Sequence, residues 1–400
     1  MTSRIYFDHS ATTPLDPRVL DAMAPYLGGA YGNASSLHQE GRRARAAVDN
    51  ARVHVAALIG ADPEEIIVTA SGTEADNLAL IGAIHATGKS GHIVTSAIEH
   101  AAILETCKFL ASTGTKITHL PVDSDGLVRT DTLLRALQSN VTLVSIMAAN
   151  NVVGTLQPIE ELAHLTKLQG VLFHTDAVQA GGKIPLDVNR LHVDLLSLSA
   201  HKLHGPKGIG ALYVRKGVKL SPIVFGGGHE RGLRSATENV AGIVGFGTAC
   251  EIAARELQDE AERLTGFRDH LATELQRLFP NAYLFGHATE RLPGHLSFGF
   301  RGQEREVGRL LTALDQVGVA VSAGSACSAH HAGAPSGVLL AMGYDPGTAR
   351  GLIRVSLGRF NTRLEVDIFL QKLEDVVRTL PVAKCNGVAE EFGLAEIGAP

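Results

Sequence analysis

The sequence lacks tryptophan, has only four cysteines and contains no long uncharged apolar run. The cysteines (Cys107, Cys250, Cys327 and Cys385) form no Cys-x-x-Cys pair, so their spacing indicates neither a zinc site nor a disulfide framework. A net charge of −5 gives no electrostatic reason to expect direct binding to nucleic acid or to a membrane surface. No apolar run approaches the length of a membrane-spanning helix, and the first residues lack the apolar region of a signal peptide. We therefore expect a cytoplasmic protein with no membrane segment, no resident metal and no direct contact with nucleic acid.

The chain is long and rich in glycine, and apolar segments alternate regularly with helical segments along it. With 400 residues, of which 45% are hydrophobic and 43 are glycine, it can form one large and one smaller buried core. Short, nearly all-apolar segments alternate with helical segments, which is typical of an α/β fold with a mainly parallel sheet between helices. The strands are expected at residues 66–69, 92–95, 116–120, 141–147, 171–174, 193–198 and 210–214. Ligands bind beyond the carboxyl ends of such strands, where polar residues are found: Thr73, His100, Asn151, Asp176 and Lys202.

A change of domain is predicted near a long helix that ends before Pro280. Its leucines recur at steps of three, four or seven residues, as on one buried face of a helix. Beyond it, strands are expected at residues 294–300, 317–322 and 353–357, with helices between them. We assign residues 15–258 to a large domain, residues 1–14 and 259–385 to a small α+β domain, and residues 386–400 to a tail.

The most informative stretch is residues 195–210, where an apolar strand runs into a polar turn holding Ser199, His201 and Lys202. A lysine just beyond a buried strand can form a Schiff base with a carbonyl cofactor once it loses its proton, and burial lowers a lysine pKa. Taken alone, a solvated loop lysine is the more frequent outcome. A second segment, Ser71-Gly-Thr-Glu74, matches a capping box whose helix N-terminus is a natural seat for a phosphate, although a plain N-cap fits it equally well.

Eight short motifs occur in order along the chain. They are Thr73-Glu74, Glu99-His100, Asn150-Asn151, Asp176-Ala-Val-Gln179, Ser199-Ala-His-Lys202, Gly226-Gly-Gly-His-Glu-Arg231, Ser325-Ala-Cys327 and Ile353-Arg-Val-Ser-Leu-Gly-Arg359. Together they resemble the cysteine desulfurases of the NifS/IscS type, which are pyridoxal-phosphate enzymes of the class V aminotransferase fold. The resemblance runs from about Tyr6 to Phe360. It implies fold type I of the PLP-dependent transferases, with a large PLP-binding domain and a small domain that carries the catalytic cysteine loop.

The resemblance also implies a role for each residue of the site. Lys202 would hold the pyridoxal phosphate and move protons at the substrate Cα, while Asp176 would keep the pyridine nitrogen protonated. His100 would stack on the ring and act as an acid or base. Gln179 would bind the ring hydroxyl, and Asn151 would bind the same hydroxyl or the substrate carboxylate. Arg354 would bind the substrate carboxylate. The phosphate would be bound by Gly72, Thr73, Ser199 and His201. Thr237 would reach the phosphate of the neighbouring subunit, which implies a homodimer with shared active sites.

Several of these residues also have a simpler interpretation. Asp176 could cap a loop at a strand end, where aspartate is common. Without the resemblance, His100 would be a polar histidine at the end of a strand. Arg354 could form a structural ion pair, and Thr237 could be a surface loop residue.

Cys327 distinguishes a desulfurase from a general aminotransferase, which needs no thiol nucleophile. It lies on a loop of small residues, Ser322-Ala-Gly-Ser-Ala-Cys-Ser328, whereas a small buried cysteine describes Cys107 and Cys250 better. The resemblance implies that L-cysteine is converted to L-alanine, and that its sulfur passes to a Cys327 persulfide and on to an acceptor protein. A lowered pKa would favour the reactive Cys327 thiolate. The one metal contact that the resemblance allows is a transient iron–sulfur ligation by Cys327 together with a scaffold partner.

Two departures from the pattern leave the pathway open. The residues after Asn150-Asn151 are Val152-Val153-Gly154, where many relatives have an acidic residue, and the tail lacks a tryptophan-containing segment for scaffold docking. Iron–sulfur assembly, tRNA thiolation and DNA phosphorothioation all remain as destinations of the sulfur. The alternatives to a desulfurase are a class V aminotransferase, a selenocysteine lyase and, less compatible with the ordered motifs, a non-catalytic scaffold.

Overall fold

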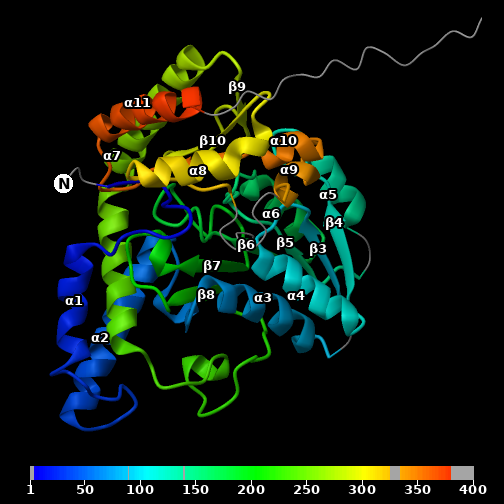
Figure 1. The fold of residues 1–400 in the computed structure, drawn as a ribbon. Coiled ribbons are helices and arrows are strands. Elements are labelled where there is room, and N and C mark those ends of the chain that lie inside the picture. The colour runs from blue at the N-terminus through cyan, green and yellow to red at the C-terminus, as the bar shows by residue number, and fades with distance from the viewer. Residues whose placement is uncertain (1–3, 89, 138–139, 325–333, 380–400) are drawn as a thin grey trace, which may run out of the picture.

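A seven-stranded sheet forms the centre of the larger part of the molecule (Figure 1). The computed structural model describes residues 4–88, 90–137, 140–324 and 334–379. The strands lie in the order β2 (Ile66–Thr69), β8 (Gly210–Val214), β7 (Leu195–Ser199), β6 (Leu172–Asp176), β5 (Leu143–Ser145), β3 (His92–Ser96) and β4 (Lys116–Leu120). Only β8 runs antiparallel to its neighbours, so the predicted mainly parallel sheet is confirmed.

The sheet differs most from the sequence-based expectation in one strand, while three others are shifted by one or two residues at their ends. The strand expected at residues 141–147 is shorter, because β5 covers only Leu143–Ser145. Beyond it, the backbone N–H of Met147 donates to Oε1 of Glu99 at 3.0 Å instead of to a neighbouring strand. The chain therefore leaves β3 early, but it stays beside β6, because the N–H groups of Ile146 and Ala148 still donate to the carbonyls of His174 and Asp176.

Helices cover both faces of the sheet. On one face, α3 (Gly72–Ala86) and α4 (Ala101–Ser112) pack their apolar residues on the strands. The other face is covered by α1 (Pro17–Leu27), α2 (Gln39–Leu58), α5 (Thr130–Ala136), α6 (Ile159–Leu168) and the first half of α7 (Val240–Leu278). Because every strand of the sheet except the edge strand β4 is almost fully buried, the polar residues that follow the strands are concentrated at the edge where the parallel strands end.

The smaller part is built on a three-stranded antiparallel sheet. Its strands lie in the order β12 (Ile353–Ser356), β10 (His295–Phe300) and β9 (Ala282–Phe285). They pack with α8 (Val307–Gln316) and α11 (Arg363–Thr379), while β1 (Ile5–Tyr6) pairs with β11 (Val319–Ala320) beside them. Two short helices, α9 (Gly337–Ala341) and α10 (Pro346–Arg350), and four 3-10 turns at Pro63–Glu65, Ala200–Lys202, Glu230–Gly232 and Glu304–Glu306 complete the described elements.

The long helix α7 belongs to both parts. Its buried residues as far as Ala253 join the core of the large sheet, and those from Leu264 onward join the core of the small sheet. The core therefore changes in the same stretch of α7 in which we place the domain boundary, between residues 258 and 259. The exact boundary stays a prediction.

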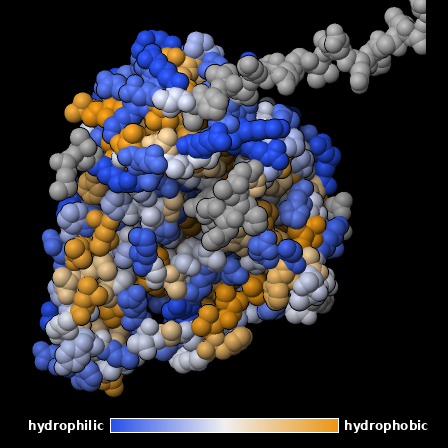
Figure 2. Space-filling model, viewed as in Figure 1, coloured by the Kyte–Doolittle hydropathy of each residue, from blue (hydrophilic) through white to orange (hydrophobic). Residues whose placement is uncertain are grey.

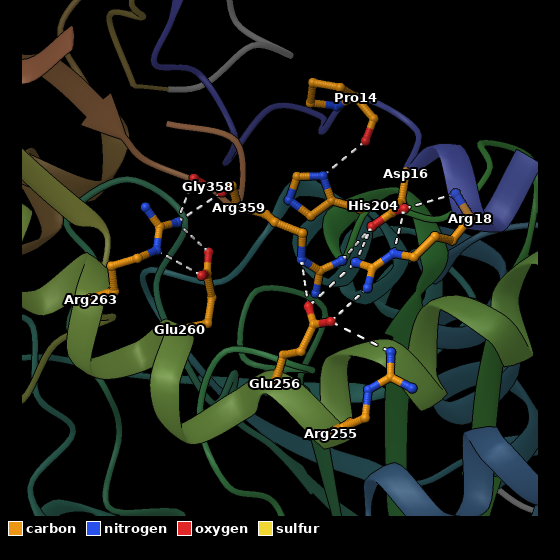
Figure 3. Close-up of polar contacts among 10 residues, drawn as sticks. All are labelled: Pro14, Asp16, Arg18, His204, Arg255, Glu256, Glu260, Arg263, Gly358 and Arg359. Carbon is orange, nitrogen blue, oxygen red and sulfur yellow. Dashed lines mark hydrogen bonds and ion pairs between the residues drawn. The ribbon is translucent and has the colours of Figure 1, made fainter. Parts of the chain in front are cut away.

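A cluster of ion pairs lies where the two parts meet (Figure 3). The buried carboxylate of Asp16 accepts from Arg18 at 2.7 Å and from Arg359 at 2.9 Å, and Glu256 of α7 pairs with the same two arginines. Arg359 follows β12, so the cluster ties the start of α1, the middle of α7 and the small sheet together. Such a network holds these three segments in one arrangement.

On the side seen in Figure 2, polar and apolar residues are mixed, with groups of apolar side chains among the polar ones. Within the described ranges, no helix combines the length and the apolar character needed to cross a bilayer.

Candidate active site

A cavity of about 240 Å³ lies beyond the carboxyl ends of the parallel strands. Its walls bring together segments from the start of the chain, from the ends of β2, β3, β6 and β7, and from β12. The lining residues are Ser10, Ala11, Ser71, Gly72, Thr73, Asp76, His100, Met147, Asn151, Asp176, Val178, Gln179, Ser199, His201, Lys202 and Arg354. This is the position in which ligands bind in open α/β sheets.

Lys202 enters this cavity from the 3-10 turn that follows β7. Its Nζ donates to the carbonyl oxygens of Ser10 at 2.6 Å and Ala11 at 2.7 Å. These acceptors lie about 190 positions earlier in the chain, and only the fold brings them to the turn. The amine is thereby held in one direction at the cavity wall.

Asp176 is a buried carboxylate at the last position of β6. One of its oxygens, Oδ1, accepts from the backbone N–H of Val178 at 2.9 Å. Burial raises the pKa of Asp176, while His100 and Lys202 act in the opposite direction. A carboxylate between these groups is suited to bind a protonated ring nitrogen.

The first turn of α3 provides an anion seat. Ser71 caps the helix by accepting from the backbone N–H of Glu74 at 3.1 Å, while the amides of Gly72 and Thr73 stay outside the helical hydrogen bonds. A Cβ on Gly72 would lie 2.6 Å from Cγ2 of Val178 and 3.3 Å from Cβ of Ser199. Glycine is therefore required for the close approach of α3 to the end of β7, and this approach leaves the helix N-terminus facing the cavity.

Arg354 reaches the cavity from β12 of the small sheet. It is almost fully buried, donates to Oδ1 of Asp8 at 2.7 Å and to the carbonyl of Asn151 at 2.8 Å, and has an Nε with no partner. Burial lowers the pKa of Arg354, and Asp8 acts to raise it. The ion pair that the sequence left as an alternative role for Arg354 is therefore present. The same guanidinium also lines the cavity.

His100, Gln179 and His201 complete the polar lining. His100 caps α4 by accepting from the backbone N–H of Ala102 at 3.1 Å. Gln179 donates from Nε2 to the carbonyl of Ser10 at 2.9 Å. Burial lowers the pKa of His201 to about 4, so its imidazole is neutral and can donate a hydrogen bond without carrying charge.

Comparison with known proteins identifies the group to which this arrangement belongs. The description of the class V aminotransferase family matches residues 5–369. The chain belongs to this family. It is 46% identical over 381 residues to a protein of Dictyoglomus turgidum named cysteine desulfurase IscS, covering 95% of this chain and 96% of that protein.

Solved structures agree with the assignment to the class V aminotransferase family. A structure described as a NifS-like protein superimposes with a TM-score of 0.88 at 42% identity, covering 94% of this chain and 100% of that chain. A structure of SspA in complex with cysteine superimposes with a TM-score of 0.79 at 35% identity, covering 90% of this chain and 100% of that chain. The fold is therefore that of fold type I PLP enzymes, as the sequence predicted.

Members of the class V aminotransferase family use pyridoxal 5'-phosphate, and the cavity fits this group. The amine of Lys202 would provide a nitrogen for the cofactor aldehyde, and Asp176 a carboxylate for the ring nitrogen. The N-terminus of α3, which is open because position 72 has no Cβ, would provide amides for the phosphate. The donor set thus matches the cofactor at its three charged or reactive ends.

The cavity brings together ten of the twelve residues that the sequence singled out. They are Gly72, Thr73, His100, Asn151, Asp176, Gln179, Ser199, His201, Lys202 and Arg354. Thr237 is exposed and does not line the cavity of its own chain. Cys327 lies outside the described residues. Among those that are described, no group of three or more histidine, cysteine or acidic side chains is arranged to hold a metal ion.

Six lining residues were not predicted. Asp76 lies four positions after Gly72 and hence on the same face of α3, so helical spacing was a usable signal for it. Ser71 begins the capping-box segment Ser71-Gly-Thr-Glu74, and Val178 lies inside the motif Asp176-Ala-Val-Gln179. Ser10, Ala11 and Met147 left no such signal, because their place in the cavity depends on contacts between distant parts of the chain.

Proposed function

We propose that this chain is a cysteine desulfurase, which converts L-cysteine to L-alanine and transfers the sulfur to Cys327. The observation that carries the proposal is the 46% identity over nearly the full length to a protein named cysteine desulfurase. The name of SspA in complex with cysteine supports the same substrate for a protein of this shape. A cavity with an amine, a carboxylate and a buried guanidinium supports amino-acid chemistry at this position.

The substrate is bound by its carboxylate. Arg354 is the cation of the cavity that lies on the small sheet, and its unpartnered Nε, together with the planar geometry of the guanidinium, suits a carboxylate. Asn151, which lines the same cavity, supplies an amide to the same group or to the ring hydroxyl of the cofactor.

Protons at the substrate are moved by Lys202 and His100. When bound, pyridoxal phosphate supplies an electron sink that makes the Cα proton and the bond between Cβ and sulfur labile. Lys202 takes the proton from Cα and returns one to it, because its amine is held at the cavity wall by Ser10 and Ala11. His100 lines both this cavity and the larger surface pocket beside it, and so is placed to hold a proton near the sulfur.

The sulfur leaves on Cys327. Its thiolate attacks the sulfur of the substrate, the bond from sulfur to Cβ breaks, and the electron pair of that bond takes up a proton at Cβ to give alanine. The product on the enzyme is a persulfide, so the reaction is a transfer of neutral sulfur and needs no external oxidant or reductant. The persulfide then passes its outer sulfur to an acceptor protein.

Mass analysis of Cys327 after addition of L-cysteine tests the proposal. We expect a gain of one sulfur atom on this residue and one alanine for each sulfur transferred. Cys327→Ser should keep the visible colour of the bound cofactor but form no alanine, whereas Lys202→Ala should lose both. Undiminished alanine formation by Cys327→Ser would reject the role of the thiol.

Other activities of the class V aminotransferase family give different outcomes in the same assay. A selenocysteine lyase would release alanine from selenocysteine but not from cysteine. An aminotransferase would consume cysteine only when a keto acid is added. A scaffold without catalysis would be colourless when purified, or would show no shift of its absorbance when cysteine is added.

We further propose a homodimer in which Thr237 reaches the phosphate of the neighbouring subunit. Thr237 is exposed on the loop before α7, and several large apolar side chains of the large part are also strongly exposed, among them Tyr31, Leu37 and Phe225 at 80%, 90% and 82%. Burial of such side chains against a second copy would be favourable. Thr237→Val should weaken cofactor binding in the dimer, and an unchanged affinity would reject this role.

A further inference from the structure

A second cavity lies behind Lys202. Ser10 and Lys202 line both this space and the cofactor cavity, so the two share a wall. The second cavity has a volume of about 50 Å³, which is room for a few water molecules. The titratable and charged side chains that line it are His9, Lys183, Lys202, His204, Glu260, His295 and Arg359.

Lys183 has no acidic partner in this cavity. Glu260, the one carboxylate in the lining, binds Arg263 through two hydrogen bonds of 2.7 and 2.9 Å (Figure 3). Burial lowers the pKa of His9 to about 3 and that of His204 to about 4, and it holds the pKa of His295 well below its usual value. These histidines are therefore neutral, and they neither compensate nor add to the charge of Lys183.

The described contact of the Lys183 side chain is with Gln179. Nζ of Lys183 donates to Oε1 of Gln179 at 3.1 Å, while Nε2 of Gln179 donates to the carbonyl of Ser10 at 2.9 Å. A lysine has only donors, so the oxygen end of the amide must face it. The second N–H of the amide is then left for the cofactor cavity, which Gln179 lines.

The two lysines also affect each other through charge. Burial, followed by the charges of Lys202 and Arg354, lowers the pKa of Lys183 to about 7. The effect is reciprocal, because a positive Lys183 makes a second positive charge on Lys202 less favourable. A lysine must be neutral to react with a carbonyl group, and a neighbouring cation is one way in which enzymes achieve this.

We propose that Lys183 is a positioning residue of the cofactor site, which fixes the amide of Gln179 and places a positive charge behind Lys202. This inference rests on the proposed function, since it concerns the same site. Lys183 acts through Gln179 and Lys202 and touches neither substrate nor cofactor.

Spectroscopic titration of the cofactor-loaded protein tests the charge. The visible absorbance of the bound cofactor is recorded against pH for the wild type, Lys183→Met and Lys183→Gln. Both variants remove the positive charge that Lys183 carries below about pH 7, so we expect the midpoint of the titration to move upward in both, by up to about one pH unit. Lys183→Arg, which keeps the charge, should restore the wild-type midpoint. An unchanged midpoint in Lys183→Gln would overturn the proposal.

Cofactor affinity tests the orientation of the amide. Lys183→Met leaves Gln179 free to rotate, and we expect about tenfold weaker binding of pyridoxal phosphate, the effect of one lost hydrogen bond. Lys183→Gln keeps an N–H donor for Oε1 and should recover most of this loss. Wild-type affinity in Lys183→Met would overturn this part. If Lys183→Met binds too little cofactor to titrate, the Lys183→Gln midpoint decides the charge.

Alanine release by the wild type distinguishes the two proposals. A wild-type protein that forms no alanine from cysteine refutes the desulfurase, whatever the Lys183 variants show. If the wild type forms alanine but the titration midpoint is the same in the wild type and the Lys183 variants, only the positioning role is refuted.

Discussion

Asp76 and Asp176 line the same cavity, Asp76 from the first turns of α3 and Asp176 from the end of β6. Burial raises the pKa of both carboxyl groups, and the charge of Asp176 raises that of Asp76 further. His100 and Lys202 act to lower the pKa of Asp176. Among the described residues, His174 is the one basic group within ion-pair distance of Asp76, at 3.7 Å, and burial lowers the pKa of that imidazole to about 3. We therefore expect Asp176 to carry the charge of the pair and Asp76 to keep its proton.

This difference predicts opposite results for two matched substitutions. Asp176→Asn removes the charge that pairs with the cofactor ring, and we expect alanine formation to fall by about a hundredfold or more. Asp76→Asn replaces a protonated acid by a neutral amide of the same shape, so activity and the cofactor spectrum should stay close to the wild type. Steady-state alanine assays and absorbance spectra check both. Equal losses in the two variants would show that Asp76 is ionised.

At the scale of elements, the start of α3 positions the phosphate seat. Gly72→Ala would place a Cβ 2.6 Å from Val178 and 3.3 Å from Ser199, so the first turn of α3 must move away from β7. Since the amides of this turn face the cavity, we expect pyridoxal phosphate to bind about tenfold more weakly or worse. Equilibrium titration of the apoprotein with the cofactor measures this.

A second glycine supplies the control. Gly266 lies in the middle of α7, and a Cβ there would meet nothing within 4 Å. Gly266→Ala should leave cofactor affinity unchanged and raise the free energy of unfolding by about 0.5–1 kcal/mol, because alanine favours the helix. A loss of affinity in Gly266→Ala, or none in Gly72→Ala, would contradict the packing argument.

The sequence predicted those elements whose pattern is local. Ile66–Thr69 and Leu195–Ser199 are short apolar runs bounded by polar turns, and both are strands in the structure. It did not predict that β8 alone runs antiparallel, because strand direction depends on how the connections cross the sheet. For the same reason Ser10 and Ala11 were missed: nothing near them in the chain indicates that Lys202 will donate to their carbonyls.

At the scale of the whole molecule, the two sheets must be held together for the site to exist. Lys202 follows the large sheet, and Arg354 lies on the small one. The helix α7 crosses both cores, and the cluster of Asp16, Glu256 and Arg359 lies between them (Figure 3). The N-terminal segment adds a third connection, since it pairs with β11 of the small part and lends carbonyls to Lys202. The distance between Arg354 and Lys202 is thus set by the arrangement of both parts.

The same arrangement buries several histidines, which predicts how stability depends on pH. His9, His174, His204 and His295 are all less than 7% exposed, and burial lowers the pKa of each below that of an unfolded histidine. The unfolded chain therefore binds more protons at these positions below about pH 6.5, so their contribution to stability is lost as the pH falls. Asp76 and Glu99 offset part of this, because burial raises their pKa values and they keep protons in the folded state. From pH 6 to pH 5 we expect a net loss of about 2 kcal/mol.

His174 isolates this effect, because it is fully buried between the hydroxyl groups of Ser145 and Ser197 at 2.9 and 3.0 Å. His174→Gln keeps polar atoms there but removes the group that binds a proton on unfolding. We expect the loss of stability from pH 6 to pH 5 to shrink by about 1 kcal/mol in this variant, whatever its stability at neutral pH. His164→Gln on the exposed face of α6 serves as the control and should leave the pH dependence unchanged. Urea unfolding at both pH values measures the free energy of unfolding. If this free energy changes equally with pH in the wild type and in His174→Gln, His174 already binds its proton in the folded protein.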